Sequence, residues 1–305
     1  MKTQKISNHL ALIDVEPAGF ENFIASYVIQ GEKIAIIETG PTSTVNNLLE
    51  GLKELEVKFE NVHYLAVSHI HLDHGGGAGT LMKHLPNAKL IVHPRGASHL
   101  VKPEKLWEQS LQVLGKIAEL YGKPEPVAKE RILDTYDGMM VNLGKSIELE
   151  VVETLGHASH HQSYFEKHSR TVFPGDAGGI YLDQFDVIVP TTPPPFHLET
   201  TLASINKLLQ KKPKQIGYTH FGLAENAEEK LKRHVSQLKL WAGIVADGVK
   251  KGESLETISG RINKNDPAVK AVANYIKTHP IMSRGIVKQN VEGFISYFQK
   301  FAKQP

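Results

Sequence analysis

A short run of histidine and aspartate has the clearest chemical meaning in this sequence. Residues 69–74 read His-Ile-His-Leu-Asp-His, so four side chains able to bind a metal lie within six residues. A turn after a strand would let His69 and His71 face one ion while Asp73 and His74 face another. The chain has no cysteine, which excludes thiolate ligands, disulfides and a cysteine nucleophile. The run therefore predicts a metal site of histidine and carboxylate ligands, and its spacing suits two ions better than one.

The run alone leaves each ion short of ligands. A catalytic zinc ion takes about three protein ligands and keeps one position open for water, whereas His69 and His71 supply only two. His157, Asp176 and His220 each follow a predicted strand, and the carboxylate of Asp176 can bridge two cations because it has two oxygens. We therefore expect these three residues to complete the site.

The elements that must position these residues form a mixed α and β pattern. Strand patterns cover residues 9–15, 24–30, 33–39, 63–68, 89–93, 146–154, 171–173 and 215–220. Helical spacing of apolar residues covers residues 42–55, 104–121 and 199–210. No strong strand pattern follows His220, and the later helical patterns lie within residues 224–252, 266–279 and 291–303. We therefore predict a mixed domain at residues 1–223 and a helical extension packed on it at residues 224–305.

Charge and hydropathy limit the kinds of molecule that the protein is expected to bind. The formal net charge is +2, and no block of five or more like charges occurs. A dedicated nucleic-acid interface is therefore not expected, and a small-molecule substrate is favoured. The sequence contains no stretch of about 20 apolar residues, which is the length needed to cross a bilayer. The first residues also lack the pattern of a signal peptide. We predict a cytoplasmic protein without membrane contact, whose helical extension either walls the substrate pocket or builds a homodimer interface.

Four motifs, taken in chain order, resemble those of the metallo-β-lactamase superfamily. They are His-x-His-x-Asp-His at residues 69–74, LGHASHH around His157, FPGDAGG around Asp176 and YTHFG around His220. The resemblance covers about three quarters of the chain. It implies an α+β fold, a four-layer αββα sandwich with the metal site on one rim between two mixed sheets, followed here by the C-terminal helical extension.

The resemblance also implies which residue binds which ion. The expected ligands are His69, His71 and His157 for the first ion, Asp73, His74 and His220 for the second, and Asp176 as the bridge. It implies two Zn²⁺ ions per chain, although the same ligand types also accept iron or manganese. The family's early Asp-Thr-Gly is replaced here by Glu38-Thr39-Gly40, a longer carboxylate that could alter the site geometry.

The predicted activity is that of a dinuclear metal-dependent hydrolase. A metal-bound hydroxide would attack an ester-like bond of a small molecule, either a thioester, a lactone, a carboxylic ester or a phosphate ester. Asp73 is the expected catalytic residue, because a carboxylate at the second ion can orient the hydroxide and relay a proton. The alternatives are a mononuclear non-haem iron dioxygenase acting on a persulfide, a nuclease of the same superfamily and a non-enzymatic metal-binding module.

Several neighbours of the predicted ligands are expected to support the site. His160 and His161 follow His157 closely, and we predict that they support the ligands or the fold rather than bind metal. Phe20 and Phe23 lie in the loop between the first two strands, where they either overhang the substrate or pack inside the domain.

Overall fold

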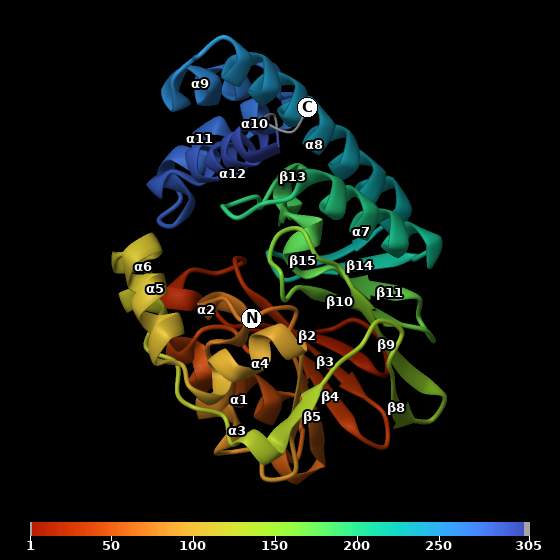
Figure 1. Cartoon of the computed structure of the whole chain (residues 1–305). Helices are drawn as coiled ribbons and strands as arrows, with labels where there is room; N and C mark the ends of the chain where they lie inside the picture. Colours follow the sequence, from red (N-terminus) through yellow and green to blue (C-terminus); the bar gives the residue numbers. More distant parts are fainter. Residues whose placement is uncertain (1, 302–305) are drawn as a thin grey trace.

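Two mixed β-sheets packed face to face, with helices on both outer faces, make up the protein (Figure 1). The computed structural model describes residues 2–301. The predicted fold class, a four-layer αββα sandwich with C-terminal helices, is confirmed.

The first sheet has its strands in chain order. Its seven strands are β1 (Thr3–Lys5), β2 (Leu10–Asp14), β3 (Ala25–Gln30), β4 (Ile34–Ile37), β5 (Val62–Ala66), β6 (Lys89–Val92) and β7 (Ile132–Asp134). The strands from β1 to β4 pair antiparallel, whereas those from β4 to β7 pair parallel. The parallel half therefore places the ends of β4 and β5 at the same edge of the sheet.

The second sheet mixes both pairings as well. Its six strands lie in the order β15 (Gly222–Glu225), β14 (Gln215–Tyr218), β11 (Thr171–Phe173), β10 (Gln162–Glu166), β9 (Ile147–Glu153) and β8 (Met140–Gly144). Only β11 and β14 pair parallel, so these two strands also end at one edge. A separate hairpin pairs β12 (Ile180–Leu182) with β13 (Val187–Val189).

The helices cover both sheets and form the C-terminal extension. Those before the second sheet are α1 (Val45–Glu54), α2 (Leu72–Gly75), α3 (Ala78–Met82), α4 (Pro94–Val101), α5 (Glu104–Leu114) and α6 (Lys116–Tyr121). Those after β13 are α7 (Leu198–Gln210), α8 (Ala227–Lys250), α9 (Leu255–Asn265), α10 (Pro267–Ala271), α11 (Ala273–Thr278) and α12 (Ile286–Phe301). Figure 1 shows α9 to α12 gathered beyond one end of the sandwich, with α8 connecting them to the second sheet.

Three apolar layers hold the sandwich together. On β3, Tyr27 and Ile29 point into the layer between the sheets, while Val28 points to the layer under the first set of helices. This alternation follows from the two-residue period of a strand, and it explains why β3 is apolar on both faces. The third layer joins the second sheet to α7 and α8 and contains Ile205 and Trp241.

Several parts of the structure differ from the sequence-based predictions, among them β1, β7, β8, β12, β13 and α9, which no sequence pattern predicted. The helix expected at residues 104–121 is broken at Gly115, which has a φ of 53° and separates α5 from α6. Strand β15 was not predicted, because its four residues are too few to show a clear period. The last helix begins at Ile286 rather than residue 291, and the end of its predicted span lies outside the described residues. The division of the chain at residue 223 stays a prediction, although sheet pairing continues to Glu225.

No helix within residues 2–301 combines the length and the apolar character needed to span a bilayer.

Asp266 connects three of the C-terminal helices. It is buried, and one carboxylate oxygen accepts hydrogen bonds from Gln237 Nε2 at 2.9 Å and Trp241 Nε1 at 2.6 Å, both on α8. The other oxygen caps the start of α10 by accepting from the backbone N–H of Ala268 at 2.9 Å. Because Asp266 directly follows α9, one side chain fixes how α8, α9 and α10 meet.

We expect Asp266→Ala to destabilise the protein by about 3 kcal/mol, because buried donors lose their acceptor and a helix loses its cap. The free energy of unfolding measured in urea tests this prediction. Asn265→Ala, which changes the exposed neighbouring side chain, is the matched control. Equal stability of the two variants would contradict the role of Asp266.

Candidate metal centre

All seven predicted metal ligands meet at one edge of the sandwich. The run that contains the first four follows β5 and continues into α2, so the first sheet supplies it. His157 follows β9, Asp176 lies in the short helical turn after β11, and His220 follows β14. The loops of both sheets therefore contribute to one cluster of side chains.

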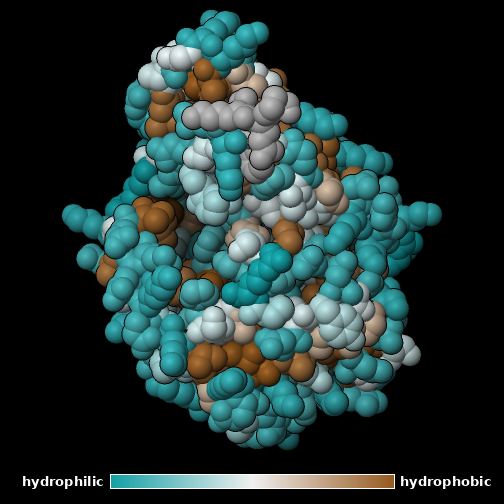
Figure 2. Space-filling view, viewed as in Figure 1, coloured by the Kyte–Doolittle hydropathy of each residue, from teal (hydrophilic) through white to brown (hydrophobic). Residues whose placement is uncertain are grey.

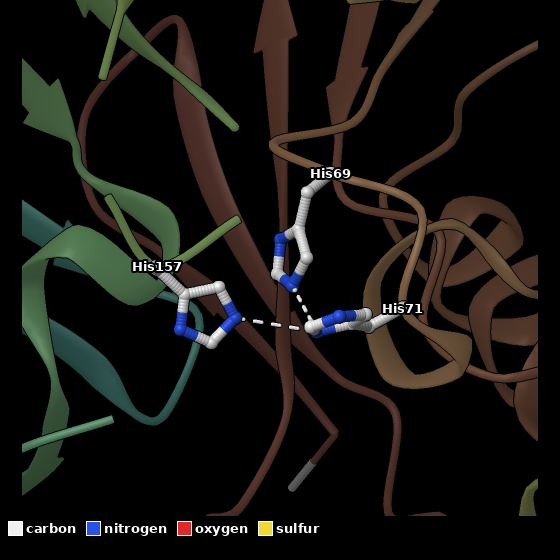
Figure 3. Close-up of side chains that lie close together, drawn as sticks. All are labelled: His69, His71 and His157. Atoms are coloured by element: carbon white, nitrogen blue, oxygen red, sulfur yellow. Dashed lines mark hydrogen bonds between the residues drawn. The ribbon is translucent and has the colours of Figure 1, made fainter. Parts of the chain in front are cut away.

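Three imidazoles converge in the first group, which consists of His69, His71 and His157 (Figure 3). His71 Nδ1 lies 2.8 Å from His69 Nε2 and 3.2 Å from His157 Nε2. Two nitrogen ligands of one tetrahedral zinc ion would lie about 3.3 Å apart, given bonds of about 2.05 Å. The three nitrogens are therefore spaced as ligands of a single ion are.

The second group consists of Asp73, His74 and His220. Asp73 Oδ2 lies 3.6 Å from His220 Nε2 and 4.0 Å from His74 Nε2. These separations are wider than those of the first group, so binding an ion here requires a small inward movement.

The Asp176 carboxylate lies between the two groups. Its Oδ1 is 3.2 Å from His74 Nε2 and 3.6 Å from His220 Nε2, on the side of the second group. Its Oδ2 is 3.4 Å from His157 Nε2, on the side of the first group. Each oxygen thus faces a different group, which is the arrangement a bridging carboxylate needs.

Two buried polar atoms at the centre of the cluster lack hydrogen-bond partners among the described residues. They are His74 Nε2 and Asp176 Oδ1, which face each other at 3.2 Å without the geometry of a hydrogen bond. Leaving a buried polar atom without a hydrogen-bond partner costs about 1–3 kcal/mol, so a bound partner at this place would stabilise the protein. A cation would complete both, and the nitrogen and carboxylate donors fit zinc, iron or manganese.

Hydrogen bonds on the outer side of the rings set which nitrogen faces the cluster. His157 Nδ1 donates to the carbonyl oxygen of Thr191 at 2.9 Å, and His220 Nδ1 donates to that of Phe23 at 3.0 Å. Each bond places the ring proton on Nδ1 and leaves the Nε2 lone pair pointing inward. Both rings are therefore oriented as metal ligands are.

Glu38 contacts the outer side of the His74 ring, as the carbonyl oxygens do for His157 and His220. Its Oε1 lies 3.2 Å from His74 Nδ1, and its Oε2 accepts the backbone N–H of Ser68 at 3.3 Å. Thr219 Oγ1 donates to Oε1 at 3.3 Å. The longer carboxylate at this position therefore reaches a ligand of the second group from outside, and it also joins the loops that follow β5 and β14.

His161 supports the turn that carries Asp176. The backbone N–H of Asp176 donates to His161 Nε2 at 3.1 Å, and His161 Nδ1 donates to Thr154 Oγ1 at 2.9 Å. Gly175 allows this approach, because a Cβ there would lie 2.8 Å from His161 Nε2 and its φ is +54°. His161 thus holds the main chain of Asp176, in line with the supporting role expected of it.

The electrostatics of the cluster favour a bound cation. Burial, reinforced by neighbouring imidazoles, lowers the pKa of His69 and His71 well below 6.5, so both stay neutral. Burial also acts to lower the pKa of His74, but Asp176 and Glu38 raise it well above that value. The buried carboxylates thus draw a positive charge into the cluster, and a divalent cation supplies that charge where the fold otherwise holds a proton.

Some contacts that shape the site gave little or no sequence signal. Thr191 and Phe23 act through carbonyl oxygens, which every residue type has, so only the fold could reveal them. Ser68 precedes the first histidine and its Oγ lies 3.0 Å from His69 Nδ1. Its position next to the motif was the only available hint.

Glu38→Gln tests the support that this residue gives to the second group. We expect affinity for the ion at that group to fall about 10- to 100-fold, as when other outer partners of metal ligands are removed. Metal titration against a competing chelator measures the change. Glu166→Gln is the matched control, because Glu166 is a buried glutamate that contacts His9 at the far end of β10. An equal effect of both substitutions would contradict the role of Glu38.

Comparison with known proteins agrees with the geometry. The family model described as the metallo-beta-lactamase superfamily matches residues 19–220, which include all seven clustered side chains. The metallo-beta-lactamase fold-containing protein ST1585 of Sulfurisphaera tokodaii is 28% identical over 244 residues, covering 78% of this chain and 88% of that relative.

Solved structures show how far the similarity in fold extends. The crystal structure of ST1585 matches with a TM-score of 0.63 at 25% identity, over 76% of this chain and 86% of its own. The metallo-beta-lactamase family protein TTHA1429 from Thermus thermophilus matches with a TM-score of 0.71 at 17% identity. That match covers 98% of this chain and 95% of the other, so the C-terminal helices share its fold. The four motifs, the sandwich that brings them together and the family match over residues 19–220 show that this chain belongs to the metallo-β-lactamase superfamily.

Proposed function

We propose that the protein is a dinuclear metal-dependent hydrolase, with zinc as the expected metal, that cleaves an ester-like bond in a small molecule. The observation that carries the proposal is the pair of ligand groups joined by Asp176, whose two oxygens face different groups. Two divalent cations held there would lower the pKa of an attacking water and polarise the substrate oxygen.

Different residues would hold each of the two ions. His69, His71 and His157 would hold one ion, and His74 and His220 would hold the other together with Asp73. Neutral imidazoles leave part of the positive charge of each ion uncancelled, which favours binding of a substrate oxygen. Asp176 would keep the two ions at a fixed separation.

Asp73 is the carboxylate of the cluster that water can reach. Its side chain is 21% exposed, whereas that of Asp176 is 8% exposed. The Asp73 carboxylate could therefore accept a proton from the attacking water and pass it to the leaving group.

Metal analysis of the purified protein together with a substrate panel tests the proposal. The panel contains a carboxylic ester, a thioester, a lactone and a phosphodiester, with a persulfide assayed by oxygen uptake. We expect two ions per chain and hydrolysis of at least one ester-like bond. A single iron with oxygen uptake would indicate the dioxygenase instead, and a metal-free, inactive protein would contradict any hydrolase.

Removal of one ligand from each group should give different metal contents. His71→Ala should empty mainly the first position and His220→Ala mainly the second, because each belongs to one group only. Asp176→Ala should weaken both positions. Metal counting by mass spectrometry after dialysis measures this, and equal loss of both ions in His71→Ala and His220→Ala would contradict two separate positions.

Asp73→Ala should lower kcat about 100-fold or more, which is the usual contribution of a proton-transferring group. It should also loosen the second ion, since Asp73 belongs to that group. Kinetics at saturating metal separate the two effects. Unchanged kcat with both ions in place would rule out the catalytic role of Asp73.

A further inference from the structure

Tyr121 is the last residue of α6 and lies near the metal centre. Helix α6 packs against α2, the short helix that carries Asp73 and His74, and against the 3₁₀ turn η1 (Pro17–Gly19). The Tyr121 side chain is only 4% exposed and belongs to the apolar cluster that also contains Phe23. Its ring is thus held by packing on the side of the centre where Asp73 lies.

Within residues 2–301 the hydroxyl of Tyr121 is neither hydrogen-bonded nor fully enclosed, whereas that of buried Tyr218 also lacks a partner but is fully enclosed. Tyr27 and Tyr164 donate to main-chain carbonyl oxygens, each at 2.7 Å. Among the described residues Tyr121 has no hydrogen-bond partner, and its hydroxyl is not one of the fully enclosed polar atoms that lack one. A fixed ring therefore ends in a hydroxyl that is free to bond to something outside the protein.

The packing of α6 on α2 brings Tyr121 close enough to the centre for two of its carboxylates to act on the phenol. Burial raises the pKa of Tyr121 well above 10, and the carboxylates of Asp73 and Asp176 raise it further. Those two carboxylates belong to the metal centre, so the phenol lies within their field. A phenol has an ordinary pKa of about 10, so it is protonated near neutral pH and can donate a hydrogen bond.

Tyr121 packs in an apolar cluster, and two large apolar side chains on the same helical segment are exposed. Leu120 and Val113, on α6 and α5, are 41% and 73% exposed. Figure 2 shows apolar surface beside a hollow, at the height where Figure 1 places α6 opposite the C-terminal helices. Such a wall suits an uncharged acyl group better than a phosphate ester.

We propose that Tyr121 is a substrate-contacting residue of the metal centre, whose hydroxyl donates a hydrogen bond to the carbonyl oxygen of an ester, thioester or lactone with an apolar acyl group. This inference rests on the proposed hydrolase function. During hydrolysis the water oxygen bonds to the carbonyl carbon, and the bond from that carbon to the leaving oxygen or sulfur breaks. The leaving atom takes a proton from the water. After the water has attacked and before the leaving group departs, negative charge develops on the carbonyl oxygen. The phenol stabilises this charge by a hydrogen bond without losing its own proton.

Tyr121→Phe removes only the hydroxyl and is the variant that tests the inference. We expect kcat/KM for p-nitrophenyl butyrate and for a butyryl thioester to fall about 10- to 100-fold, mainly through kcat, because one donor to a developing charge is lost. Metal content and Tm should match the wild type. Tyr64→Phe, which removes a half-buried phenol at the middle of β5, is the control and should retain wild-type kinetics.

Three outcomes would overturn the role of Tyr121. Wild-type kcat/KM in Tyr121→Phe would show that the hydroxyl does not contact the substrate. A lower Tm or metal content that accounts for the lost activity would show a structural role. Equal losses in Tyr121→Phe and Tyr64→Phe would show that the effect is not specific.

Binding of butyrate, the acyl product, to the metal-loaded proteins separates this inference from the proposed function. If no substrate is hydrolysed but butyrate binds several-fold more weakly to Tyr121→Phe than to the wild type, the hydrolase proposal fails and with it the role of Tyr121 in hydrolysis, while the contact of its hydroxyl with an acyl ligand stands. If substrates are hydrolysed and neither kinetics nor butyrate binding depends on Tyr121, the hydrolase proposal stands and the inference fails. If neither protein hydrolyses a substrate or binds butyrate, both fail.

Discussion

The position of the Asp176 carboxylate is the constraint on which the rest of the site depends. One carboxylate must present an oxygen to an imidazole carried by the first sheet, His74, and another to one carried by the second sheet, His157. Such contacts tolerate shifts of only a few tenths of an ångström before a ligand is lost. The two sheets must therefore meet in one fixed register at this edge.

Direct hydrogen bonds between the sheets supply that register. The backbone N–H of Gln162 donates to the carbonyl oxygen of Ser68 at 2.9 Å, and that of Ala25 donates to Thr219 at 2.8 Å. Ser68 and Thr219 each immediately precede a clustered histidine. The apolar layer between the sheets provides most of the free energy of packing, but hydrophobic contacts are non-directional and do not fix a register. These hydrogen bonds are directional, so they fix the ends of the strands next to the ligands.

The sequence predicted those parts of the site whose residues lie close together in the chain or follow a recognisable strand. The residues at 69–74 are close in the chain, so their spacing alone indicated metal binding. His157, Asp176 and His220 could be added because each follows a strand pattern. The contact of Glu38 with His74 and the free hydroxyl of Tyr121 arise from packing between distant segments, and no local period encodes them. The break at Gly115, which sets the direction of α6 and so the place of Tyr121, depends on a single backbone conformation.

The C-terminal helices belong to the environment of the site and do not merely cover the second sheet. The ring of Phe23 lies 5.3 Å from that of His220 and 4.8 Å from that of His279, which follows α11. His279 Nδ1 accepts the backbone N–H of Met282 at 3.2 Å, so its ring is held by its own turn. One aromatic side chain thus lies between a clustered histidine and the extension, while its carbonyl oxygen orients the same His220. A change in the packing of the extension would therefore reach His220 through Phe23.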